Sequence, residues 1–154
     1  MFSKEERKII NTTFWGNVKK ALNKIPDAEG KFIQWLNYPL KIKDVFLRLT
    51  VDNQRAVISL DIQSSDEGVR ALIWEQLEEL RKAMESDVTY PAVWDKNAVN
   101  NADQNISQIR WELDNVSLYE SKDEDKIINF FSTTLKQFDA FYAEFGDVLK
   151  NLVN

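Results

Sequence analysis

The chain has 154 residues, of which 44% are hydrophobic and 29% charged, a formal net charge of −5, and neither histidine nor cysteine. Without imidazole or thiolate it cannot build a Ser-His-Asp or Cys-His nucleophile, a disulfide or a usual zinc site. Any catalysis must therefore rest on carboxylates, lysine, tyrosine or hydroxyls. The composition is that of a globular protein, and the length predicts a single domain over residues 1–154.

The charge is unevenly spread along the chain. Residues 1–60 carry 11 Lys and Arg against 6 Asp and Glu, whereas residues 61–154 carry 9 against 19. A basic first part suits a nucleic acid or an acidic partner surface, and ordinary solvated faces explain it equally well. The first residues are charged, and no apolar run approaches the ~18 residues of a membrane span, which predicts a cytoplasmic protein.

The first predicted element is an amphipathic helix. Ser3 and Glu6 have the spacing of a capping box, which opens a helix that runs to about Ile25, before a proline. After a turn, residues 31–35 have the composition of a short strand.

A β-hairpin is predicted over residues 44–62, because apolar and polar residues alternate on both sides of the turn at 52–55. Ser64 and Glu67 then form a second predicted capping box. The leucines and isoleucines that follow recur at helical spacing and predict one amphipathic helix to about Ser86.

The segment 87–105 is rich in asparagine and aspartate and predicts a flexible loop. Alternation returns at 106–113, and a short apolar run follows at 116–119, so this region predicts one bulged strand or two short ones.

The last element is a helix of nearly thirty residues that begins with a third predicted capping box, Ser121 with Glu124. The predicted order is therefore α-β-β-β-α-β-(β)-α. This order predicts an α+β fold in which a mostly antiparallel sheet of about four to five strands is covered by three helices.

The last helix also predicts an interaction surface, because its apolar face is wider than one small sheet covers. We expect self-association or a protein partner at this face, through four aromatic residues. They are Phe138, Phe141, Tyr142 and Phe145.

The candidate site for chemistry is the hairpin. Metal-dependent nucleases place two carboxylates on a hairpin to hold Mg²⁺, with a lysine two residues after the second. Asp44 and Asp61 match the carboxylates, with Arg48 or a nearby lysine on phosphate, but Gln63 stands at the lysine position. The alternative is that Asp61 forms an ion pair with Arg48 across the strands. Outside this Mg²⁺ hypothesis no cofactor is expected.

Aromatic and basic residues are interleaved in the first part of the chain. They suit either a stacking surface for single-stranded nucleic acid or ordinary core packing, and core packing is the commoner fate. These residues are Lys31, Phe32, Trp35, Tyr38, Lys41, Lys43 and Arg48.

Several short runs resemble the bacterial domain of unknown function 4268 family across nearly the whole chain. They are Phe14-Trp15, Trp35-Leu36-Asn37-Tyr38, Lys43-Asp44-Val45-Phe46-Leu47-Arg48, Arg55-Ala56-Val57-Ile58-Ser59-Leu60, Trp94 and Phe130-Phe131. Members of this family occur alone or at the C-terminal end of longer proteins whose other part looks like a restriction-type nuclease. The resemblance therefore implies a link to nucleic-acid processing or defence, but it assigns no catalytic residues.

These observations favour a non-enzymatic interaction module that self-associates or docks on a partner. The alternatives are a Mg²⁺-dependent nuclease or a degenerate relative of one, with Asp44 and Asp61 as metal ligands, and nucleic-acid binding without chemistry through residues 1–60.

Overall fold

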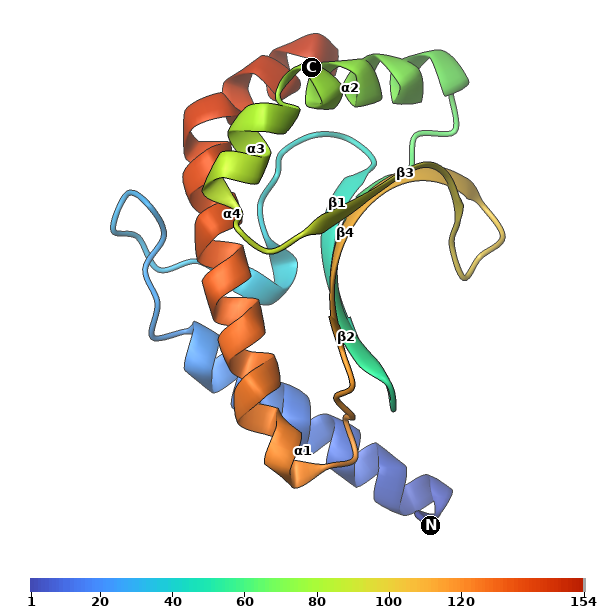
Figure 1. Ribbon diagram of the computed structural model, residues 1–154, viewed down its shortest axis with the longest axis vertical. Helices are drawn as coiled ribbons and strands as arrows, with labels where there is room; N and C mark the ends of the chain where they lie inside the picture. The colour runs from blue at the N-terminus through green and yellow to red at the C-terminus, as the bar shows by residue number, and fades with distance from the viewer. Residues whose placement is uncertain (154) are drawn as a thin grey trace.

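The fold has two layers, a four-stranded sheet and a set of helices that covers one of its faces (Figure 1). The computed structural model describes residues 1–153. Within them the strand order is β1-β2-β4-β3, and every neighbouring pair is antiparallel. The strands are β1 (Val45–Val51), β2 (Arg55–Ile62), β3 (Ala92–Val99) and β4 (Asn105–Asp114). The helices are α1 (Lys4–Leu22), α2 (Glu67–Glu79), α3 (Arg81–Asp87) and α4 (Glu124–Val153), with 3-10 turns η1 (Trp35–Asn37) and η2 (Ser121–Asp123).

The predicted α+β fold with an antiparallel sheet is confirmed, with four strands and, among the described residues, four α-helices instead of three. The core lies between the helices and the inner face of the sheet, where α4 runs along the height of the molecule (Figure 1). Its largest fully buried side chains include Trp35, Trp111, Phe131, Phe138 and Phe141. None of the helices in residues 1–153 is both long and apolar enough to cross a membrane.

Local signals placed the first helix and the hairpin correctly. The amide of Glu6 donates to Ser3 Oγ at 3.1 Å and the amide of Ser3 to Glu6 Oε1 at 3.2 Å, so the capping box is confirmed, although α1 ends at Leu22. The hairpin forms as predicted, and Asp52 Oδ1 accepts the amides of Gln54 and Arg55 in its turn.

The strand predicted at 31–35 is wrong. The chain forms a single bridge between Pro26 and Phe32 and then the turn η1. Trp35 is 1% exposed, and its indole Nε1 donates to the carbonyl of Ile25 at 2.9 Å. Anchoring this side chain in the core, and not strand pairing, determines the path of the segment.

The helix predicted up to Ser86 is two helices, α2 and α3, separated at Leu80. The change of direction, visible in Figure 1, keeps both helices packed on α4. The predicted capping box at Ser64 is also wrong, because Asp66 is the N-cap and its Oδ1 accepts the amides of Gly68 and Val69.

Strand β3 lies inside the predicted loop 87–105, which is therefore wrong over Ala92–Val99. A register shift between Asp95 and Ala98 interrupts the alternation that identifies a strand from sequence. Strand β4 is one continuous strand, and the run 116–119 is not a strand, although its backbone bonds to the β1–β2 turn.

Helix α4 starts without the predicted capping box. Ser121 belongs to the turn η2, and the carboxylate of Glu124 accepts a hydrogen bond from Asn17 Nδ2 of α1 at 3.0 Å. A tertiary hydrogen bond between α1 and α4 therefore takes the place of the local hydrogen bond that was expected between Glu124 and Ser121.

Candidate functional site

The outer face of the sheet is polar, and no helix of residues 1–153 covers it (Figure 1). The candidate hairpin residues lie on this face, in a network that crosses all four strands. Asp61 is its central carboxylate and is 5% exposed. Its Oδ1 accepts from Gln108 Nε2 at 2.8 Å and its Oδ2 lies 3.5 Å from Arg48 Nε. The ion pair between Asp61 and Arg48 is thus confirmed.

The network continues through two further arginines. Arg110 lies 3.5 Å from Asp95 and 3.3 Å from Glu112. Arg55 lies 3.1 Å from Glu112 and 3.5 Å from Asp114. Each arginine of this face is therefore already neutralised by a carboxylate, so a phosphate group would have to displace an existing partner.

Asp44 does not face Asp61 across the hairpin. Asp44 is exposed, has a φ of 61°, and its carbonyl accepts the amide of Gln63 at 2.7 Å, whereas Asp61 lies opposite Phe46. Within residues 1–153, no three Asp, Glu, His or Cys side chains gather in a way that would hold a metal ion. Mg²⁺ needs several free oxygen ligands, whereas the carboxylate of Asp61 is already bonded to Arg48 and Gln108. Asp61 therefore suits an ion pair better than a metal site.

The residues of the hypothetical stacking surface are divided between the core and the surface. Trp35 is buried, and the Tyr38 hydroxyl donates to Asp139, whereas Phe32 is 71% exposed beside the ion pair of Lys31 and Glu29. They do not form one continuous aromatic platform of the kind that single-stranded nucleic acids use.

The four aromatic residues expected at an interface on α4 lie mostly in the core. Phe138 is 1%, Phe141 0% and Tyr142 6% exposed, and Phe145 is half-buried. The expectation that they form a docking surface does not fit these placements. Their apolar face is wide because several parts of the chain pack on it together with the sheet. These parts are the segment before β1 (residues 23–44) and the helices α2 and α3.

A buried polar cluster ties the segment before β1 to α4. Asp139 is 7% exposed, and its two oxygens accept the Tyr38 hydroxyl at 2.5 Å and the Ala28 amide at 2.7 Å. The Tyr142 hydroxyl donates to the carbonyl of Leu40. Burial, and then the hydrogen bond to Asp139, raise the pKa of Tyr38 above its ordinary value, and burial likewise raises the pKa of Tyr142.

This cluster predicts a loss of stability in alkali. Because the folded-state pKa of Tyr38 and of Tyr142 is raised, the unfolded chain loses these protons first, above about pH 10. The free energy of unfolding should then fall by about 1.4 kcal/mol per pH unit for each tyrosine, whereas this contribution is fully present below pH 10. Urea unfolding of the wild type and of Tyr38→Phe between pH 8 and pH 11 checks this, and we expect a shallower fall for the variant. Parallel curves would contradict it.

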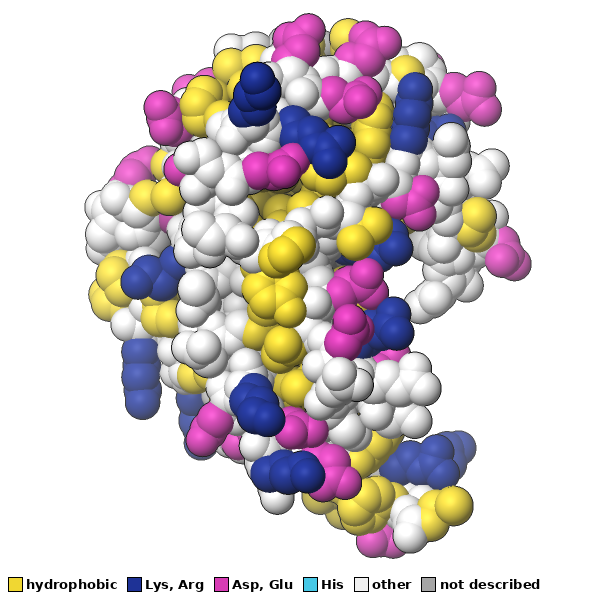
Figure 2. Space-filling model, in the orientation of Figure 1, with side chains coloured by type: hydrophobic (Ala, Val, Ile, Leu, Met, Phe, Trp, Pro, Cys, Tyr) yellow, Lys and Arg dark blue, Asp and Glu magenta, His cyan; other side chains and the backbone are white. Residues whose placement is uncertain are grey.

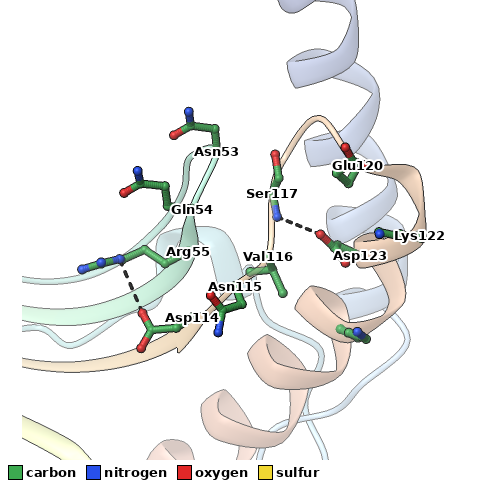
Figure 3. Close-up of a pocket in the computed structure, with 11 residues that line it drawn as sticks. Asn53, Gln54, Arg55, Asp114, Asn115, Val116, Ser117, Glu120, Lys122 and Asp123 are labelled. Carbon is green, nitrogen blue, oxygen red and sulfur yellow. Dashed lines mark hydrogen bonds and ion pairs between the residues drawn. The ribbon is translucent and has the colours of Figure 1, made fainter.

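A wide polar hollow of about 830 Å³ lies where the β1–β2 turn, the end of β4 and the start of α4 meet (Figure 3). The amide of Ser117 donates to Asp123 at 3.0 Å, and Arg55 pairs with Asp114 at the other side. Lys122 and Lys126 also line it, and neither makes an ion pair with any other residue of the described chain.

An apolar groove of about 320 Å³ lies beside this hollow, between α4, the end of β4 and the segment before β3. The rings of Tyr90 and Phe130 pack edge to face at 4.9 Å in its wall, and Leu113 lines it from β4. Figure 2 shows hydrophobic side chains as a stripe between α4 and the sheet. The remaining lining residues are Thr89, Lys126, Asn129, Thr133, Thr134 and Gln137.

Sequence reasoning missed this groove because its walls come from three distant segments. Phe130 stands out in the sequence as an apolar residue beside the main stripe of the last helix, and this was the available signal. Tyr90 lies in the segment that was expected to be a loop, so nothing local brought it to Phe130.

The molecule is thus a two-layer α+β domain with an uncovered polar sheet face and two adjoining surface hollows. The chain belongs to the family described as "Domain of unknown function (DUF4268)", whose model matches residues 10–146, and the family resemblance is confirmed. No curated protein and no solved structure matches the chain.

Proposed function

We propose that this domain is a non-catalytic module that binds another protein through the groove between α4 and the end of β4. The observation that carries the proposal is the groove itself, which joins the apolar side chains of Leu113, Tyr90 and Phe130 to a polar rim. Such a combination is typical of sites that hold a ligand by apolar contact and orient it by a few hydrogen bonds.

Two features of the sheet face support binding over catalysis. The carboxylate of Asp61 is engaged by Arg48 and Gln108, and the other acidic side chains of the network are paired with arginines. Neither a metal ion nor a phosphate backbone finds unpaired ligands there. A link to nucleic-acid processing would then be indirect, through the bound protein.

Affinity capture with a substituted groove tests the proposal. Thr133 is exposed at the groove wall, so Thr133→Arg would fill the groove without entering the core. Lys136→Glu, also exposed on α4 but outside the groove, is the matched control. From a nuclease-treated lysate we expect a protein retained by the wild type and by Lys136→Glu, and lost with Thr133→Arg. A second copy of this chain is one such protein, and mass in solution identifies it.

The result that would overturn the proposal is cleavage or tight binding of labelled DNA or RNA. Purified protein is incubated with single- and double-stranded forms, with Mg²⁺ or Mn²⁺ and with chelator. We expect no metal-dependent cleavage.

Asp61→Ala should affect stability. Because the carboxylate is buried, its removal leaves Gln108 and Arg48 without their acceptor, and we expect the free energy of unfolding to fall by about 1 to 3 kcal/mol. Asp44→Asn, at an exposed position with positive φ that asparagine tolerates, should change it by less than about 0.5 kcal/mol. Urea unfolding measures both. Equal effects would contradict the structural role of Asp61.

A further inference from the structure

The end of β4 has an unpaired edge beside the apolar groove. The ladder between β3 and β4 begins at the pair Ala92 and Trp111, whereas β4 continues to Asp114 and pairs there with β2. The last three residues of β4, Glu112 to Asp114, therefore have a strand neighbour on one side only among residues 1–153. Pro91, just before β3, lacks the amide hydrogen that would extend the ladder.

The unpaired edge and the groove meet at Leu113. Its side chain lines the groove, and it shares the inner face of β4 with Trp111. In an antiparallel pair, residues directly opposite each other project to the same face of the sheet. A residue of an added strand opposite Leu113 would therefore send its side chain into the groove, toward Phe130 and Tyr90.

Among the described residues that line the groove, Lys126 is the charged one, and it also lines the polar hollow. It makes no ion pair with another residue in the part of the chain that the structure describes. On an added strand, an acidic side chain next to the apolar side chain opposite Leu113 would complement the charge of Lys126. The groove is open along a rim of exposed side chains, Thr89, Asn129 and Thr133. A small molecule bound there would remain largely exposed to solvent, whereas the rest of a polypeptide would shield its bound side chain from solvent.

We propose that the groove and the unpaired end of β4 together bind an extended segment of a partner protein, which continues the line of β3, places one large apolar side chain over Leu113 and directs a neighbouring carboxylate to Lys126. This mode joins main-chain hydrogen bonds, which give affinity, to a side-chain pocket, which gives specificity. It rests on the proposed function, since it names how that protein is bound.

Synthetic peptides test the inference directly on the full chain. The probe is a blocked hexapeptide of β-branched residues with one central tryptophan and one aspartate. It is titrated into labelled protein while amide chemical shifts are recorded. We expect shifts at Leu113, Asn129 and Thr133. Alanine in place of the tryptophan should weaken binding at least about tenfold, and lysine in place of the aspartate about fivefold. N-methylation of the peptide backbone should abolish binding.

Protein variants complete the test. Lys126→Glu should weaken binding of the aspartate peptide about fivefold and improve that of the lysine peptide, whereas Lys136→Glu leaves both unchanged. Failure of every peptide to bind, equal binding of the N-methylated peptide, or shifts at the same amides with a deoxythymidine oligonucleotide would overturn the inference. If the capture experiment still retains a protein through the groove while the peptides fail, the proposed function stands and the extended mode is wrong.

Discussion

Replacing Phe138 with alanine is expected to lower the free energy of unfolding by about 3 to 5 kcal/mol. The ring is 1% exposed at the point where α4, β4 and the segment before β1 meet. Its centroid lies 5.8 Å from those of Tyr38 and Tyr142 and 6.1 Å from that of Trp111. Removing it leaves a cavity among large rings that cannot close without moving three separate elements.

Urea unfolding followed by circular dichroism measures this loss. Phe32→Ala is the matched control, because that ring is 71% exposed, and we expect a change of less than about 0.5 kcal/mol. Phe138→Asp should fail to fold, since it would bury a charge without a partner. If Phe138→Ala instead kept the stability of the wild type and changed only the mass in solution, the ring would belong to an interface and not to the core.

The same ring shows why the width of an apolar helix face is an ambiguous signal. From sequence, the face of α4 appeared too wide for a small sheet, which suggested a second protein. In the structure the extra width is covered by this chain, because Tyr38 packs on Phe138 and donates to Asp139, which anchors the segment before β1 against α4. That segment has no strand or helix period, so its packing could not be inferred from sequence.

Periodic patterns that continue through a whole element were the reliable part of the prediction, whereas two of the three predicted capping boxes did not form. The hairpin of β1 and β2 was predictable because alternation and a polar turn lie within one stretch, and the pairing of Asp61 with Arg48 follows from that local register. Strand β3 was missed because a bulge after Asp95 breaks its alternation. The groove was missed because Tyr90, Leu113 and Phe130 meet only once β3 and β4 have formed their sheet and α4 packs against it.

The buried carboxylate of Asp139 provides the second large expected effect. Asp139→Ala should lower the free energy of unfolding by about 2 to 4 kcal/mol, because the Tyr38 hydroxyl and the Ala28 amide both lose a charged acceptor. Asp139→Asn keeps one acceptor oxygen and should lose less.

Asp147→Ala is the control for this loss. Its side chain is 90% exposed and lies 3.7 Å from Lys150, so its replacement should change the stability by less than about 0.5 kcal/mol. Urea unfolding at pH 7 compares the three variants. The alanine variant at position 139 should also bring the pKa of Tyr38 closer to its ordinary value, because the hydrogen bond to this carboxylate is one of the causes that raise it. Similar losses for Asp139→Ala and Asp147→Ala would mean that Asp139 does not hold the segment before β1 on α4.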